Sequence, residues 1–148
     1  MASSLLCMNN QDWTIKSKPY DLRLRLFGFA CVITRLAQFL QTRGRVAVVF
    51  SEQLLKSGTS AGANYEEADD GSSRRDRTSK RKIVLRELKE TSLRLRVMRE
   101  TDILAAVHDP VITECEELVK IVATLIRKTR PEPKNRRQPP PSRSEPMG

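Results

Sequence analysis

The stretch from Leu54 to Ala68 reads LLKSGTSAGANYEEA, and it decides the fold. Small and polar residues recur in it at steps of four, three and four, which places them on one face of an α-helix: Ser57, Ala61, Asn64 and Ala68. Gly58 and Gly62 each cost about 1 kcal/mol relative to alanine in a helix interior, so close packing against a neighbour must favour them. The stretch predicts a close-packed helix rather than a flexible Gly/Ser linker, with the polar group of Asn64 facing the core.

Apolar stripes on either side of this stretch predict three further helices. Asp21 is a suitable N-cap, and the heptad-like stripe that follows it predicts a bundle helix: Leu22, Leu26, Phe29, Ile33, Leu36 and Leu40. The second helix is expected from about residue 45 to residue 67 or 68, with its core face continued upstream by Val46, Phe50 and Leu54.

The third and fourth helices are expected after residues that cap helices well. Ser73 with Asp76 three residues later resembles a capping box, and the third helix is expected to reach about residue 100. Its core side is predicted to hold Ile83, Val84, Glu87, Glu90, Thr91, Arg94 and Met98. Asp109 as N-cap with Pro110 at the first helical position begins the fourth helix, whose stripe comprises Ile112, Cys115, Val119, Val122 and Ile126.

The predicted fold is an all-α, up-down-up-down antiparallel four-helix bundle over residues 20–130. Residues 1–19 lack periodicity and are expected to form a flexible N-terminal arm. Residues 131–148 are rich in proline and arginine, and because proline removes backbone donors and clashes within helices, they are expected to be a disordered basic tail.

Two segments resemble a known family. SGTSAGANYEEA at 57–68 is similar to the signature of the bacterial four helix bundle protein family, and KIVLRELKET at 82–91 is similar to the third-helix pattern of that family. Founding members of this family are encoded in intervening sequences of large-subunit ribosomal RNA genes. The resemblance covers about residues 20–130 and implies a bundle that assembles into a ring, expected to be a homopentamer. It implies no known reaction.

Basic charge is concentrated in the third predicted helix. The chain holds 27 Lys and Arg against 18 Asp and Glu, a net charge of +9, which favours nucleic acid or an anionic surface as partner. Residues 74–99 hold eleven basic and three acidic residues, so this segment carries a net +8. It predicts a phosphate-binding stripe, with a solvated face as the alternative; the candidate residues are Arg74, Arg75, Arg77, Lys80, Arg81, Lys82, Arg86 and Lys89.

Several common catalytic motifs are missing from the sequence. His108 is the only histidine, and neither a Glu-x-x-His motif, a phosphate-binding Gly-Lys loop nor a Gly-x-Ser-x-Gly elbow occurs. We therefore expect no enzymatic activity, no cofactor and no metal site. The carboxylates of Glu87 and Glu90 admit an acid/base interpretation, but a polar core that fixes helix register is favoured, formed by Ser57, Asn64, Glu87, Glu90 and Thr91.

The expected function is that of a non-enzymatic, cytoplasmic, homo-oligomeric bundle that binds RNA or DNA through its third helix and its tail. Leu24, Phe27 and Cys31 lie opposite the first core stripe and predict self-association. The family also resembles the accessory protein of diversity-generating retroelements, a basic ring that engages a reverse transcriptase and its RNA. This resemblance implies a reverse transcriptase or another protein as a partner. The alternative is a protein-binding adaptor without a nucleic-acid role. No apolar run reaches about 18 residues, so no membrane partner is expected.

Overall fold

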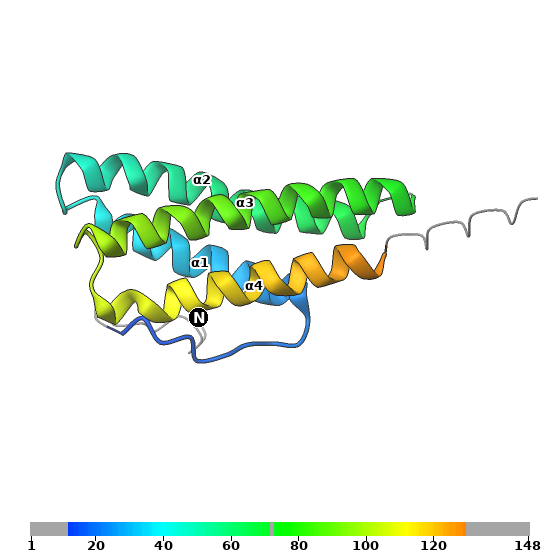
Figure 1. Cartoon of the computed structure of the whole chain (residues 1–148), viewed down its shortest axis with the longest axis horizontal. Coiled ribbons are helices and arrows are strands. Elements are labelled where there is room, and N and C mark those ends of the chain that lie inside the picture. The colour runs from blue at the N-terminus through cyan, green and yellow to red at the C-terminus, as the bar shows by residue number, and fades with distance from the viewer. Residues whose placement is uncertain (1–11, 72, 130–148) are drawn as a thin grey trace, which may run out of the picture.

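The computed structural model describes residues 12–71 and 73–129, and four antiparallel helices form it (Figure 1). They are α1 (Leu22–Leu40), α2 (Arg45–Asp69), α3 (Arg74–Glu100) and α4 (Asp109–Lys128). A short 3-10 helix, η1 (Ala106–His108), directly precedes α4, and the described residues contain no strand. The predicted all-α four-helix bundle is confirmed.

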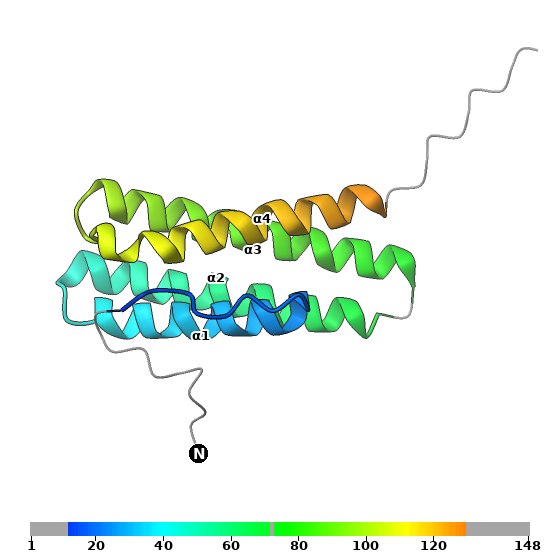
Figure 2. The same ribbon diagram turned by 90° about the horizontal axis from the view of Figure 1, so that it is seen from below.

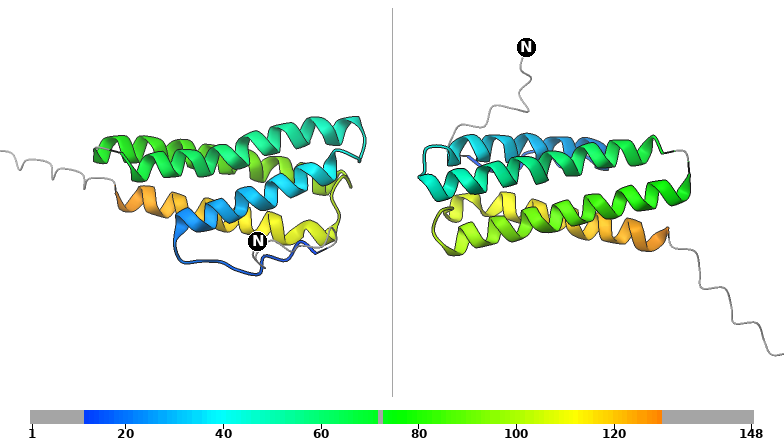
Figure 3. Two further views of the ribbon diagram at one scale, coloured as in Figure 1. Left: turned by 180° about the vertical axis from the view of Figure 1, so that it is seen from behind. Right: turned by 90° about the horizontal axis from the view of Figure 1, so that it is seen from above.

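The helices are arranged as a square in which each packs beside its neighbours along the chain. Figure 2 shows α1 beside α2 and α3 beside α4, and Figure 3 shows that α2 and α3 extend past the first turn of α1. The pair α1 and α4 is the least closely packed of the neighbouring pairs.

The predicted N-caps of α1 and α3 are confirmed, whereas α4 begins one residue earlier than predicted, with His108 and not Asp109 at the N-cap position. The Asp21 carboxylate accepts a hydrogen bond from the backbone N–H of Arg23 at 2.9 Å. The Ser73 hydroxyl accepts one from the backbone N–H of Asp76 at 3.1 Å. Both contacts satisfy amides that the first helical turn leaves without a partner.

Close packing of α2 against α1 follows from the glycines in the 57–68 stretch. A Cβ placed on Gly58 would lie 2.7 Å from Cγ2 of Ile33, whereas a Cβ on Gly62 would meet only the carbonyl oxygen of Leu26, at 3.9 Å. Gly58 therefore sets the approach of the two helices, as the small-residue pattern predicts, whereas the prediction of close packing at Gly62 was wrong, because a Cβ there has room.

The core face of α2 is rotated slightly from the predicted stripe. Val46 is 62% exposed, and Ala47 and Ser51 are buried in its place. Asn64 is half-buried rather than in the core, and its amide donates to the carbonyl oxygen of Ser60 in its own helix at 2.9 Å. The prediction of Asn64 as a core polar group was wrong, because an Asn side chain in a helix can bond the preceding turn.

The core face of α3 is also rotated, because leucines outside the predicted stripe take the central positions. Leu88 and Leu95 are fully buried. Glu87 and Glu90 lie at the edge of the interface, and their side chains are 17% and 45% exposed. The two carboxylates are therefore not core groups. Among the side chains of the predicted polar network, only those of Ser57 and Thr91 bond each other, with their hydroxyl oxygens 2.7 Å apart in the buried interface.

The segment before α1 lies against the bundle. Residues 12–19, here called the strap, contain no helix or strand and run beside α1 (Figure 2). Trp13 is only 5% exposed and packs on the rings of Phe39 and His108, which differs from the expectation of a flexible arm. His108 belongs to η1 and is only 4% exposed. Residues 1–11 and the predicted tail at 131–148 lie outside the described residues.

Candidate nucleic-acid interface

Basic side chains recur every seven residues on the exposed face of α3. At 1.5 Å of rise per residue, their spacing is about 10 Å, and the series extends over about 30 Å of helix. With Arg86, which lies between two of them, these exposed residues form what we call the basic row: Arg75, Lys82, Arg86, Lys89 and Arg96.

The middle of the basic row borders a shallow depression. It is lined by Lys82, Leu85, Arg86, Lys89, Glu90 and Leu93, all from the outward face of α3. Leu93 is 55% exposed, so the depression combines an apolar floor with cations along its edges.

Most cations of the basic row have no acidic partner among residues 12–71 and 73–129. Within residues 12–71 and 73–129, neither a hydrogen bond nor an ion pair is formed by the side chains of Arg75, Lys82, Lys89 and Arg96. Arg86 lies 3.8 Å from Glu87, a distance that indicates a weak surface contact. The row therefore presents charge to an external anion without first breaking strong internal pairs.

Four of the eight predicted interface residues lie away from this row and have other surroundings. Arg74 donates to the carbonyl oxygen of Thr129 at 2.8 Å, which ties the start of α3 to the end of α4. The Lys80 amine lies 2.7 Å from the Glu67 carboxylate on α2. Arg77 is half-buried and its side chain lies beside Gly71.

Arg81 is the fourth, and it faces the interior. Its Nε is buried and has no hydrogen-bond partner in the part of the chain that the structure describes. Burial raises the pKa of the neighbouring Tyr65 hydroxyl, and the charge of Arg81 opposes that shift. The structure thus brings together Arg75, Lys82, Arg86 and Lys89 of the predicted set, and it adds Arg96, which the heptad spacing in the sequence could have identified.

Glu87 and Glu90 of α3 each lie beside an arginine of the same helix. Glu90 lies 3.4 Å from Arg94 on the same helix, and Glu87 faces Arg86. No group of three or more His, Cys, Asp or Glu side chains within residues 12–71 and 73–129 is placed to hold a metal ion. Cys115 is buried and its thiol donates to the carbonyl oxygen of Leu88. Burial raises the pKa of this thiol to about 12, so it remains protonated.

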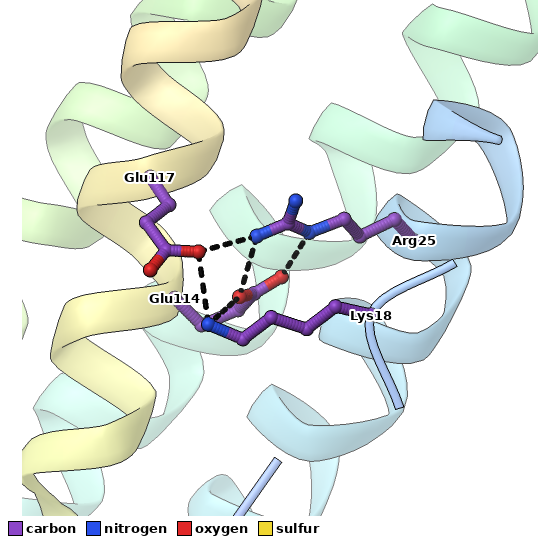
Figure 4. A network of polar contacts seen from close by, with 4 residues as sticks. All are labelled: Lys18, Arg25, Glu114 and Glu117. Atoms are coloured by element: carbon purple, nitrogen blue, oxygen red, sulfur yellow. Dashed lines mark hydrogen bonds and ion pairs between the residues drawn. The ribbon is translucent and has the colours of Figure 1, made fainter. Parts of the chain in front are cut away.

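A second charged cluster joins the strap, α1 and α4 (Figure 4). Arg25 contacts both oxygens of Glu114, at 2.7 and 2.9 Å, and one oxygen of Glu117 at 2.6 Å. The amine of Lys18 lies 2.9 Å from the same Glu117 oxygen. The Glu114 side chain is only 3% exposed, so two cations surround a buried carboxylate.

This cluster is structural in character because its charges satisfy one another. The hydrogen bonds from Lys18 and then Arg25 lower the pKa of Glu117, and the bond to Glu117 raises the pKa of Lys18. Sequence reasoning missed it. The sequence feature that could have indicated the cluster is Glu114, a glutamate within the apolar face of residues 111–126, together with Arg25 on the first helix.

The fold and the basic row define a class: small, all-α, antiparallel four-helix bundles that present one charged helix. No model of a protein family matches the chain, and no curated protein does. A crystal structure of a protein with unknown function, from the S23 ribosomal protein family of Bacteroides thetaiotaomicron, is similar to this chain. The TM-score is 0.66 and the identity is 30% over 98% of that protein and 72% of this chain. The chain therefore belongs to the S23 ribosomal protein family, and it carries segments beyond the shared fold. None of the helices in residues 12–71 and 73–129 combines the length and the apolar composition needed to cross a membrane.

Proposed function

We propose that this protein is a non-enzymatic, self-associating, cytoplasmic four-helix bundle that binds nucleic acid through the basic row of α3. The observation that carries the proposal is the series of exposed cations at heptad spacing, which have no acidic partner in the part of the chain that the structure describes. A nucleic-acid backbone is the common partner that presents anions repeatedly along a line, and cations that neutralise its phosphates release bound counterions.

Recognition is expected to depend on charge rather than on base sequence. The described aromatic residues, Trp13, Tyr20 and Tyr65 among them, lie off α3, so no stacking platform accompanies the row. RNA is favoured over DNA by two indications. The matched structure comes from a family named for a ribosomal protein, and the 57–68 motif resembles proteins encoded within ribosomal RNA genes.

The salt dependence of binding tests this proposal. Five phosphate contacts predict that log affinity falls with log salt at a slope of about −3.5 to −4.5, from 0.7–0.9 per contact. Changing the heptad residues Arg75, Lys82, Lys89 and Arg96 to Gln should reduce the slope by about 3 while leaving the helical circular dichroism unchanged. Fluorescence anisotropy with labelled RNA and DNA of the same sequence measures both slopes.

A matched control carries the same loss of charge elsewhere. Arg45, Lys56, Lys120 and Arg127 are exposed on α2 and α4, and their change to Gln should leave the slope nearly intact. If both quadruple variants lose the same slope, the binding follows net charge and not the row. Arg74 and Arg81 are unsuitable for this test, because the first bonds Thr129 and the second is partly buried.

Self-association is supported by apolar side chains on the outside of α1. Leu24 is 57% exposed and Phe27 is 63% exposed, and Cys31 lies on the same face. Burying such a face against a second copy removes it from water. Light scattering should give a multiple of the 16.9 kDa chain mass. The family resemblance implies a homopentamer, for which this multiple is five. Phe27→Ser should lower this mass, whereas Val46→Ser on α2 should not. A monomer at micromolar concentration would refute self-association.

A protein-binding adaptor is the second candidate. It is favoured by the apolar floor of the depression, where Leu93 is exposed between cations. A lack of binding to any nucleic acid at low salt, with the oligomer intact, would favour this candidate, and a reverse transcriptase or another protein would then be the partner to test.

A further inference from the structure

The strap is held on the bundle by side chains near its two ends. The Trp13 ring lies 6.0 Å from the Phe39 ring, nearly edge-on, and 5.3 Å from the His108 ring. At the other end, the Lys18 amine lies 2.9 Å from Glu117 and 3.4 Å from Glu114.

The backbone of the strap does not contribute in the same way. Within the described part of the chain, no backbone–backbone hydrogen bond joins residues 12–19 to a helix. The strap is therefore not an integral layer of the fold. It behaves as an extended peptide bound to a surface formed by Phe39, His108, Glu114 and Glu117, which we call the strap-binding surface.

The strap joins α1 next to the exposed apolar face of this helix. Tyr20, which links the strap to α1, is fully exposed, and Leu24 follows one helical turn later. A neighbouring copy packed on Leu24 and Phe27 would lie beside the root of the strap. An extended segment of eight residues spans about 26 Å, enough to reach across such a contact.

We propose that the strap-binding surface is a docking site between copies of this chain, and that residues 12–19 of one protomer bind Phe39, His108, Glu114 and Glu117 of its neighbour. The exchanged contacts are the same as those within one chain, so exchange sacrifices none of them. Within an oligomer the neighbouring surface is present at high effective concentration. This inference rests on the self-association proposed above, but not on nucleic-acid binding.

Carbodiimide cross-linking of the unmodified protein tests the exchange. This reagent joins an amine directly to a carboxylate, and Lys18 lies in contact with Glu117. Equal amounts of nitrogen-14 and nitrogen-15 protein are unfolded together, refolded, cross-linked and digested. Mass spectrometry then shows whether the Lys18 and Glu117 peptides of each cross-link came from one chain or from two. Exchange predicts that about half of these cross-links join a light to a heavy peptide.

A second ion pair provides the control within the same sample. Lys80 and Glu67 lie 2.7 Å apart between α3 and α2, so their cross-links report contacts inside one bundle and set the background of mixed pairs. A mixed fraction for Lys18–Glu117 above that background supports exchange. A fraction at that background in an oligomeric sample overturns exchange while leaving self-association intact, and a monomeric protein overturns both.

Two substitutions at the aromatic end test the anchor. Trp13→Ala should lower the yield of mixed Lys18–Glu117 cross-links several-fold, and Trp13→Phe should retain it because a ring still packs on Phe39. Mixed cross-links that persist equally in both variants would show that Trp13 does not seat the strap, and would overturn the proposed surface.

Discussion

The hydroxyl groups of Ser57 and Thr91 lie 2.7 Å apart at the centre of the α2–α3 interface. The Thr91 hydroxyl also lies 2.8 Å from the carbonyl oxygen of Glu87, to which it donates. The distances favour Thr91 as the acceptor from Ser57, because the other acceptor within reach of the Ser57 hydroxyl, the Leu54 carbonyl oxygen, lies at 3.4 Å. The pair fixes the axial position of α3 relative to α2 through a directional contact that apolar packing lacks.

We expect Ser57→Ala to lower the free energy of unfolding by about 0.5–1.5 kcal/mol, the usual net contribution of such a hydrogen bond. Thermal or urea denaturation measures it. Thr59→Ala on the exposed side of α2 is the control, because the Thr59 hydroxyl bonds only its own helix. Equal losses in the two variants would mean that the interhelical bond contributes nothing beyond helix propensity.

The two glycines of the 57–68 stretch should respond to alanine in opposite directions. Gly58→Ala places a methyl group against Ile33, and the resulting overpacking costs about 1–3 kcal/mol, which outweighs or cancels the better helix propensity. Gly62→Ala meets no close atom and should stabilise the protein by up to about 1 kcal/mol. Melting temperatures of the two single variants would disprove this argument if they moved together.

The buried carboxylate of Glu114 should contribute strongly to stability. Glu114→Gln removes the charge that Arg25 contacts at two oxygens, and we expect a loss of about 2–3 kcal/mol, moderated because Arg25 keeps Glu117. Glu116→Gln, an exposed neighbour on the same helix, should change stability little. Indistinguishable urea midpoints for the two variants would show that the charged cluster does not stabilise the folded protein.

His108 should make stability depend on pH below neutrality. Burial lowers the pKa of this imidazole, and the hydrogen bond with the Ala105 backbone partly opposes that shift. Among the nearby charges, Arg43 and Arg99 lower the pKa and Asp109 raises it. The unfolded chain therefore takes up the proton first, at the ordinary value near 6.5. Stability should be complete above that pH and should fall as the pH drops toward the lower pKa of the folded protein.

Replacement of His108 isolates this effect, because the chain has no other histidine. His108→Asn keeps an acceptor for the Ala105 amide, which His108 Nδ1 accepts at 3.0 Å. The variant should be less stable throughout, yet its melting temperature should vary less between pH 6.5 and 5 than that of the wild type. An unchanged slope would show that other groups cause the acid sensitivity.

The helices themselves were predictable because each carries local signals. Asp21 and Ser73 are residue types that cap helices through local hydrogen bonds. The spacing of small residues in 57–68 is typical of a helix that packs closely against a neighbour. Together with the apolar stripes of the other helices, these signals predict the all-α bundle.

The rotation of the core face of α3 was not predictable from the same pattern. Apolar side chains surround much of this helix, and Glu87, Glu90 and Arg94 fall on the same stripe as Ile83 and Met98. Which stripe is buried depends on the helices that pack against α3. In the structure, Leu88 and Leu95 of α3 are buried against α2 and α4. The burial of Trp13 depends likewise on Phe39 and His108, which are distant in sequence.

The basic row was only partly predictable for a related reason. Charge counting found the segment, but Arg81 and Lys80 point toward other helices, and this became apparent only when the helix was placed against its neighbours. Heptad spacing would have separated the two groups, because residues seven apart share one face.

Trp13 is the only tryptophan of the chain, and it belongs to the strap rather than to a helix. Its fluorescence emission consequently reports the seating of residues 12–19, while far-ultraviolet circular dichroism reports the four helices. Two spectroscopic probes can thus follow two different parts of one small protein without any label. Denaturation curves from them coincide only if strap and bundle come apart as one cooperative unit, and an earlier red shift of the emission would reveal a folded bundle whose strap-binding surface is vacant.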